Sequence, residues 1–146
     1  MGVKLPTHSD LGSNFVLVRV HAASINPVDY KMVEMSIVGS RMVKMPATPG
    51  KDFAGVIAKV GKANNTGLRE GQRVFGRLAG QPQYGSLGEY ILVNVGEDAC
   101  VPLPDGVSFE SGAAFGTAGT AAMQSIKPYL PPQGRGGNGH FRNSIC

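Results

Sequence analysis

The chain has 146 residues, of which 42% are apolar and 16% charged, with a formal net charge of +4. This length suits one domain with a single core, and this composition excludes wholesale disorder. Twenty-one glycines and ten prolines are too many for a helical bundle. They favour a mainly β fold of short strands joined by tight turns.

Charge and cysteine content exclude several classes of function. The basic residues are scattered and accompany no DNA- or RNA-binding motif, so we expect no nucleic-acid partner. A weaker interpretation of the mild positive charge is a nonspecific binder of anions. Two cysteines, Cys100 and Cys146, are too few for a zinc ribbon or a disulfide framework. The start of the chain does not resemble a signal peptide, and no apolar run has the length of a membrane span. We therefore expect a cytoplasmic protein without membrane contact.

The first elements can be predicted from alternation. Residues 1–14 are polar and rich in turn formers, so we expect an irregular lead-in. Residues 15–23 alternate between apolar and mixed positions, which predicts a half-buried strand. His21 falls on the polar face of this strand. It is either a ligand or base, or a structural residue, and the lack of a nearby Cys or His partner favours the structural role.

The next segment reads SINPVDYK, at residues 24–31. Pro27 fixes its own φ and biases the residue before it away from helix, so the segment predicts a strand exit followed by a turn or short helix. Asp29 and Lys31 then lie on that turn, at a strand end where sites are commonly built. For Asp29 we favour a bracing role, through hydrogen bonds to its own turn, over a catalytic one.

A second segment, at residues 48–61, reads TPGKDFAGVIAKVG. The Pro-Gly pair predicts a turn, and residues 56–60 predict a strand with a glycine at each end. Lys51 and Asp52 are therefore expected on the connection before that strand. Between the two segments, residues 32–47 are rich in methionine. They form either a loop or short helix whose thioethers fill gaps, or a flexible apolar lip over a substrate pocket.

Three further strands are predicted at residues 73–78, 88–95 and 100–103, each flanked by turn residues. Short strands with glycine-rich turns indicate a closed or nearly closed β-barrel.

From Ser108 the pattern becomes helical. Ser108 is a good N-cap, and apolar residues then recur at helical spacing as far as Ile126. Glycines 112, 116 and 119 interrupt this helix, each at a cost of about 1 kcal/mol relative to alanine. Either the helix packs closely on the barrel, or residues 116–120 lie against a cofactor and the helix is split near Gly116. We favour the split helix with a functional contact.

The end of the chain, residues 128–146, is rich in proline and glycine, and we expect a disordered tail. Residues 134–139 read GRGGNG and formally match the dinucleotide-binding pattern G-x-G-x-x-G. That pattern binds a pyrophosphate only between a strand and a helix. Prolines precede it here and too little chain follows it, so we reject the match.

Five segments together carry a resemblance that none would carry alone. They occur in one order and read SINPVDYK (24–31), TPGKDFAGVIAKVG (48–61), EGQRVFG (70–76), GSLGEY (85–90) and AAFGTAGTA (113–121). In this order they resemble the medium-chain dehydrogenase/reductase superfamily, in its zinc-independent quinone-oxidoreductase and fungal enoyl-reductase-like branch. The resemblance covers only the N-terminal GroES-like domain, from about Asn14 to about Tyr129. It implies a partly open β-barrel with short helices and a C-terminal helical segment, over residues 15–127, without a Rossmann domain.

The resemblance also implies site residues and cofactors. Zinc-dependent members carry a Cys at the position that matches Asn26 and a His-Glu pair at Lys51-Asp52, so we expect no metal. An NADPH cofactor is implied, although the nucleotide-binding domain that would hold it is not seen in the sequence. Lys31 and Thr117 are the implied catalytic residues, and Asn26, Thr117 and Thr120 the implied cofactor-binding residues. Purely structural roles stay open for three of these residues. Lys31 would then be a surface lysine, Asn26 a turn cap, and Thr120 a helix residue whose hydroxyl bonds to the preceding turn.

The implied function is reduction of quinones or of activated enoyl or enone double bonds, with a small-molecule substrate. A tyrosine that donates a proton in several relatives has no counterpart at residues 38–41, so the proton would come from solvent or not be added. We interpret the chain as a truncated portion that is inactive alone, and the resemblance allows a homo-oligomer in a longer form. The alternative is a non-catalytic GroES-like barrel that acts as an interaction or regulatory module.

Overall fold

The computed structural model describes residues 12–34, 48–62, 66–80 and 84–129. They form five strands, two α-helices and a short 3-10 helix. Their bounds are β1 Phe15–Ser24, α1 Pro27–Glu34, β2 Asp52–Val60, β3 Arg73–Arg77, β4 Tyr90–Asn94, β5 Ala99–Pro102, α3 Phe109–Ile126 and η1 Lys127–Tyr129. The strands build one antiparallel sheet in the order β4-β1-β2-β3-β5.

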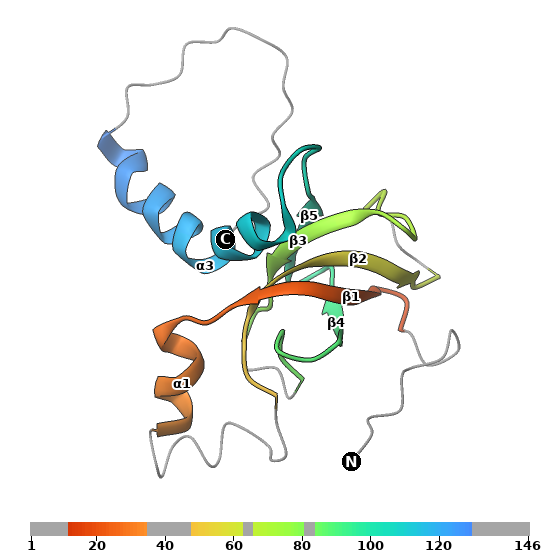
Figure 1. The fold of residues 1–146 in the computed structure, drawn as a ribbon, viewed down its shortest axis with the longest axis horizontal. Coiled ribbons are helices and arrows are strands. Elements are labelled where there is room, and N and C mark those ends of the chain that lie inside the picture. The colour runs from red at the N-terminus through yellow and green to blue at the C-terminus, as the bar shows by residue number, and fades with distance from the viewer. Residues whose placement is uncertain (1–11, 35–47, 63–65, 81–83, 130–146) are drawn as a thin grey trace, which may run out of the picture.

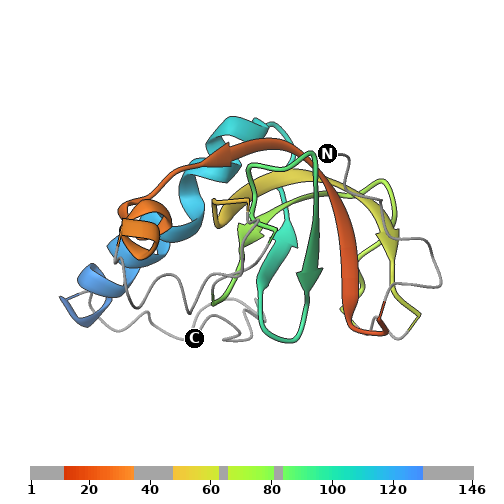
Figure 2. The same ribbon diagram turned by 90° about the horizontal axis from the view of Figure 1, so that it is seen from below.

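The sheet is strongly curled (Figures 1 and 2) and encloses an apolar core. Strand β2 is the central strand, and β1 lies between β2 and β4 and pairs with both. The core is contributed by inward-facing residues of the strands and the turns beside them, namely Val16, Val18, Phe53, Ile57, Leu68, Val74, Leu78, Ile91 and Val93. The curled sheet confirms the mainly β fold that the turn-rich sequence predicts and the partly open barrel that the resemblance implies.

Strand β2 begins at Asp52, four residues before the predicted start, so the prediction of Asp52 on a connection is wrong. The strand continues through Gly55, which pairs with Val20. A Cβ atom at Gly55 would lie 2.1 Å from the carbonyl oxygen of Arg19. Glycine therefore permits a close approach of β1 rather than ending the strand.

Helix α3 is continuous, so the prediction of a split near Gly116 is wrong. It begins after Ser108, whose side chain accepts a hydrogen bond from the Ser111 backbone as an N-cap. Gly112 and Gly116 are buried against the sheet. A Cβ atom would lie 2.7 Å from Leu103 Cδ1 at Gly112 and 2.6 Å from Asp52 Cγ at Gly116. These glycines let the helix pack closely, and they do not break it.

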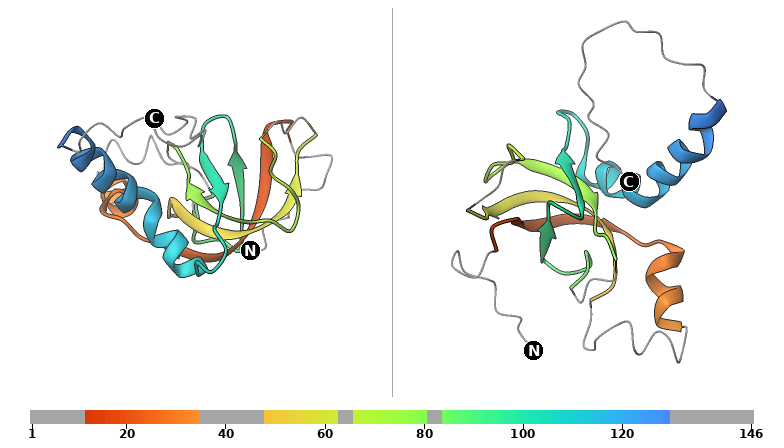
Figure 3. Two further views of the ribbon diagram at one scale, coloured as in Figure 1. Left: turned by 90° about the horizontal axis from the view of Figure 1, so that it is seen from above. Right: turned by 180° about the vertical axis from the view of Figure 1, so that it is seen from behind.

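Helices α1 and α3 both project beyond the same end of the sheet (Figures 1 and 3). The chain leaves β1 directly into α1, and the first half of α3 packs on β1, β2 and β3. Of the methionine-rich segment 32–47, the first three residues end α1, and residues 35–47 lie outside the described residues, as does the GRGGNG segment. Within the described ranges, no helix is both long and apolar enough to cross a membrane.

Candidate active-site wall

A buried carboxylate occupies the junction of the sheet and the two helices. Asp52 is the first residue of β2, and its side chain is 0% exposed. Its Oδ2 accepts hydrogen bonds from Ser24 Oγ at 3.3 Å, from Asn26 Nδ2 at 2.9 Å and from the Thr117 backbone nitrogen at 2.7 Å. Its Oδ1 accepts a fourth from Thr117 Oγ1 at 2.7 Å. One carboxylate therefore ties the end of β1 and the middle of α3 to β2.

Thr117 is bound to this carboxylate by both its backbone and its side chain. Its hydroxyl also accepts a hydrogen bond from Arg77 Nε, at 3.1 Å. Arg77 ends β3 and pairs with Asp52 across the sheet. The buried negative charge thus lies beside a cation, with the threonine hydroxyl between them. Gly116 makes this arrangement feasible, since any side chain there would overlap Asp52.

Asn26 links the same carboxylate to α1. It precedes Pro27, the first residue of α1, and its carbonyl oxygen accepts a hydrogen bond from the Asp29 backbone at 2.9 Å. In return Asp29 Oδ2 accepts one from the Asn26 backbone at 2.7 Å. This reciprocal pair closes the first turn of the helix. Asp29 therefore braces its own turn, as the sequence suggested.

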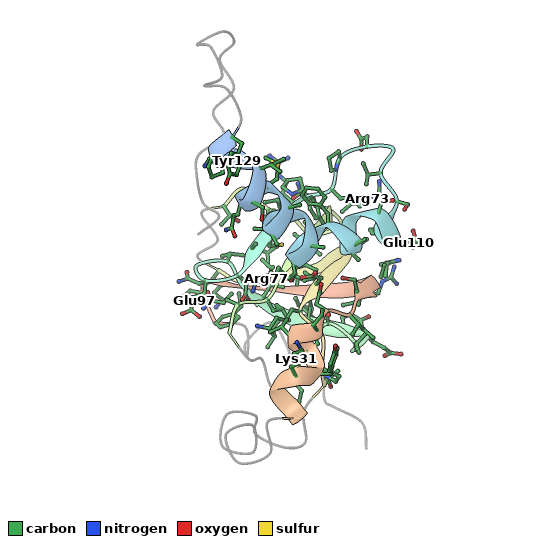
Figure 4. The ribbon with its side chains drawn as sticks, turned by 90° about the vertical axis from the view of Figure 1, so that its left-hand side faces the viewer. Lys31, Arg73, Arg77, Glu97, Glu110 and Tyr129 are labelled. Atoms are coloured by element: carbon green, nitrogen blue, oxygen red, sulfur yellow. The ribbon has the colours of Figure 1, made fainter. Side chains whose placement is uncertain are left out.

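The remaining candidates lie on the same two helices, Lys31 on α1 and Thr120 on α3. Lys31 is exposed on α1 and makes no hydrogen bond or ion pair with the residues that the structure describes. Thr120 lies one helical turn beyond Gly116 and donates its hydroxyl to the Gly116 carbonyl at 2.7 Å. Figure 4 shows Lys31 and Arg77 on the side of the molecule where both helices lie. The structure thus joins Asn26 and Thr117 through Asp52, with Thr120 one helical turn beyond Gly116 and Lys31 five residues after Asn26 on α1.

Sequence reasoning missed Asp52 and Arg77 as parts of this arrangement. An acidic residue that opens an apolar strand was the available signal, because a buried carboxylate there must find donors. The sequence does not say that those donors come from a helix more than sixty residues later. His21, the other early candidate, lies apart from this cluster and is exposed. Its ring stacks on Phe109 with centroids 4.5 Å apart, and Arg19 Nη2 lies 3.2 Å from its Nε2.

Lys51 lies next to Asp52 in sequence but has a different environment. It is buried, and its ammonium group donates a hydrogen bond to the Gly80 carbonyl. Desolvation lowers the pKa of Lys51, and the positive charge of Arg77 lowers it further. The Asn26 amide nitrogen and the Lys51 ammonium group are donors rather than zinc ligands. Among the described residues, no three His, Cys, Asp or Glu side chains gather around a metal-sized space.

The second half of α3 contrasts with the half that carries Thr117. Residues 121–129 are all exposed, and this part of the helix extends away from the sheet (Figure 1). The large apolar side chains in these residues are exposed to solvent, Met123 to 49%, Ile126 to 48% and Tyr129, in η1, to 87%. Phe115, on the outer side of the first half, is 54% exposed. An apolar strip of this kind on a projecting helix is typical of a contact surface.

Comparison with known protein families decides the classification. The family model for the alcohol dehydrogenase GroES-like domain matches residues 12–105. The chain belongs to this family. It is therefore part of the medium-chain dehydrogenase/reductase superfamily, as its five sequence segments indicated.

Two curated relatives are similar over most of the chain. A trans-enoyl reductase of Aspergillus terreus, pgmF, is 38% identical over 122 residues, which cover 81% of this chain and 34% of the relative. A zinc-type alcohol dehydrogenase-like protein of Schizosaccharomyces pombe is 40% identical over 130 residues, which cover 86% and 36%. The chain thus spans about a third of the length of the relatives it matches.

Solved structures give the same fold. The quinone oxidoreductase of Coxiella burnetii is 28% identical with a TM-score of 0.67, over 80% of this chain and 36% of that one. The YhdH protein of Escherichia coli, solved with bound NADPH, is 28% identical with a TM-score of 0.61, over 86% and 38%. The GroES-like part of this superfamily is therefore the part that the chain supplies, and its relatives are oxidoreductases.

Proposed function

We propose that the chain is the substrate-domain portion of an NADPH-dependent, zinc-independent oxidoreductase that reduces quinones or activated enoyl or enone double bonds. The observation that carries this proposal is the Asp52 cluster, which holds Asn26 and Thr117 together at one end of the sheet. The names of the relatives support the reaction class, since they include an enoyl reductase and a quinone oxidoreductase. The NADPH complex of a structural relative supports the cofactor.

Zinc independence rests on the chemistry of the donors. Asn26 turns its amide nitrogen toward a carboxylate, and Lys51 offers a buried ammonium group. Neither can ligate zinc, and a nearby ammonium group opposes a second cation. A partly exposed hydroxyl and amide, in contrast, suit the polar groups of a nicotinamide cofactor. Asn26, Thr117 and Thr120 would hold that cofactor from this side.

The chemistry is divided between cofactor and chain. When bound, the nicotinamide supplies the hydride. The chain must stabilise the negative charge that develops on the substrate oxygen, and a preorganised donor does this best. Lys31 is exposed on α1 and carries its cation five residues after Asn26. We assign it the role of donor to that oxygen, and solvent the role of proton source for the product carbon.

A nucleotide-binding domain is required to complete the site, and the apolar strip of α3 is where it would pack. Met123 and Ile126 on the outer half of α3, and Tyr129 in η1 directly after it, are exposed. A chain that supplies one wall of a site binds its cofactor weakly, so we expect no turnover from these 146 residues alone.

The experiment compares the chain alone with the same chain joined to a nucleotide-binding domain of the superfamily. We expect NADPH-dependent reduction of an enone, an enoyl thioester or a quinone by the joined protein only. Lys31→Ala should lower kcat by about 10²- to 10³-fold, the usual effect of removing one charge-stabilising donor. Lys62→Ala is the matched control, because Lys62 is also an exposed lysine but follows the far end of β2.

Two results would contradict the proposal. One is a joined protein that binds NADPH but reduces none of the three substrates. The other is equal activity of Lys31→Ala and Lys62→Ala. Association of the chain alone with another protein, unaffected by NADPH, would instead support a non-catalytic interaction module.

A further inference from the structure

Thr117 lies in a hydrogen-bond chain whose direction is fixed. Arg77 Nε lies 3.1 Å from Thr117 Oγ1, and an arginine nitrogen can only donate. Asp52 Oδ1 lies 2.7 Å from the same hydroxyl, and a carboxylate can only accept. The hydroxyl must therefore accept from Arg77 and donate its single proton to Asp52.

The consequence is a restriction on what Thr117 can offer a ligand. A hydroxyl has one proton and two lone pairs. In Thr117 the proton is bound to Asp52 and one lone pair to Arg77, so one lone pair remains for a ligand. The Thr117 side chain is only partly buried. The Thr120 hydroxyl is restricted in the same way, since its proton goes to the Gly116 carbonyl at 2.7 Å. Both threonines can accept a hydrogen bond from a ligand, and neither can donate one.

We propose that Asp52 is a positioning residue that sets this polarity. Because of Asp52, the Thr117 hydroxyl can only accept a hydrogen bond from a ligand. It therefore binds an N–H donor, such as a primary carboxamide, and cannot stabilise an oxyanion. The donors left for a developing negative charge are then Lys31 and the second amide proton of Asn26, whose first proton goes to Asp52 at 2.9 Å. This inference rests on the proposed function, because quinones and enones carry no N–H group whereas a nicotinamide carboxamide does.

The polarity itself can be tested on the 146-residue chain without any cofactor. In an NMR spectrum of the labelled chain, we expect a slowly exchanging Thr117 hydroxyl proton with a through-hydrogen-bond coupling to Asp52 Cγ. Asp52→Asn should remove this coupling. A Thr117 hydroxyl proton that exchanges at the rate of an exposed serine, such as Ser125, would overturn the inference.

The consequence for the ligand is tested with the chain joined to a nucleotide-binding domain. The probes are NADPH and its reduced 3-acetylpyridine analogue, in which a methyl group replaces the carboxamide NH₂. We expect the joined protein to bind NADPH about fivefold to tenfold more tightly than the analogue, as one lost hydrogen bond implies. Thr117→Val should abolish this preference, and Thr117→Ser should retain it.

Ser125→Ala is the matched control, because Ser125 donates its hydroxyl to Ala121 on the same helix but on the exposed outer half. It should leave the preference unchanged. A joined protein that binds neither probe contradicts the proposed function. A joined protein that binds both probes equally, or whose preference survives in Thr117→Val, contradicts only the acceptor role of Thr117. The Thr117→Ser variant keeps the test valid where an Asp52 variant does not fold.

Discussion

Lys51 and Asp52 are neighbours in sequence, both are buried, and they carry opposite charges, yet their surroundings differ. Asp52 accepts four hydrogen bonds from three segments of the chain. Among the described residues, Lys51 donates a hydrogen bond to the carbonyl of Gly80, an exposed residue, and its pKa is lowered by desolvation. Burial of a charge is stabilising only where partners compensate its lost hydration. Asp52 is thus a structural junction, whereas Lys51 is a buried cation with incomplete compensation.

The same difference makes Asp52 more important than Lys51 for the candidate site. The partners of Asp52 include Asn26 and Thr117, two of the four candidate site residues. Lys51 donates its hydrogen bond to the connection between β3 and β4, and no hydrogen bond among the described residues joins it to Asn26 or Thr117. Changes around Asp52 should therefore affect both stability and the site, while a change at Lys51 should affect mainly the pH dependence of stability.

The largest effect is expected from Asp52→Ala. This change leaves the partly buried donors of Ser24, Asn26 and Thr117 without their acceptor, at a cost of about 3 kcal/mol in the free energy of unfolding. Urea unfolding of the 146-residue chain measures it. A loss below about 1 kcal/mol would show that water replaces the carboxylate, and would remove Asp52 as a junction.

The next largest effect on stability is expected from substitution of Gly116 in α3, and it should distinguish this residue from Gly119 in the same helix. A Cβ atom at Gly116 would lie 2.6 Å from Asp52 Cγ, within a buried and bonded side chain. At Gly119 the nearest obstacle is the Phe115 ring at 2.8 Å, and that ring is 54% exposed. We expect Gly116→Ala to destabilise the chain by about 2 kcal/mol, as overpacking does.

Gly119→Ala is the control, because alanine favours the helix by about 1 kcal/mol and the exposed Phe115 ring can move aside. Its unfolding free energy should change by less than about 1 kcal/mol in either direction. Equal destabilisation by the two variants would mean that α3 does not depend on close contact with Asp52.

A smaller effect is expected from Lys51→Met, and it depends on pH. The folded pKa of Lys51 lies below its ordinary value of 10.5. Between these two values the unfolded chain binds more protons than the folded chain, so stability rises with pH. Lys51→Met should remove this rise. Urea unfolding of both proteins at a series of pH values below 10.5 tests it, and parallel stability curves would refute it.

The smallest effect on this chain is expected on the outer half of α3. Met123 and Ile126 are about half exposed, so changing either to serine should alter the unfolding free energy by less than about 0.5 kcal/mol. The same changes should weaken association with a separately supplied nucleotide-binding domain, measured by titration calorimetry. Ser125→Ala, between them on the helix, should leave that association unchanged.

Local patterns predicted much of the fold. Alternation at residues 15–23 gave β1 within one residue, and Ser108 gave the start of α3. The errors both concern glycine. Gly55 and Gly116 resemble breakers in sequence, but each allows a close approach by a segment distant in the chain. Such an approach is a tertiary contact, so a local pattern cannot distinguish it from a turn.

The site was predicted less completely, for a related reason. The resemblance identified Asn26, Thr117, Thr120 and Lys31 as candidates, and their roles stay predictions. It gave no role to Asp52 beyond the absence of a zinc ligand. The partners of a buried carboxylate are chosen by the fold, and neither Arg77 nor Thr117 lies near Asp52 in sequence.

Hydrogen exchange at the Thr117 amide is the most direct test that Asp52 fixes α3 to the sheet. The Thr117 backbone nitrogen lies 2.7 Å from Asp52 Oδ2, whereas Ile57 lies deeper in β2 and does not depend on that carboxylate. Asp52→Ala should accelerate exchange at Thr117 at least about tenfold more than at Ile57, because a local anchor is lost in addition to global stability. Equal acceleration at the two amides would contradict the anchoring role of Asp52.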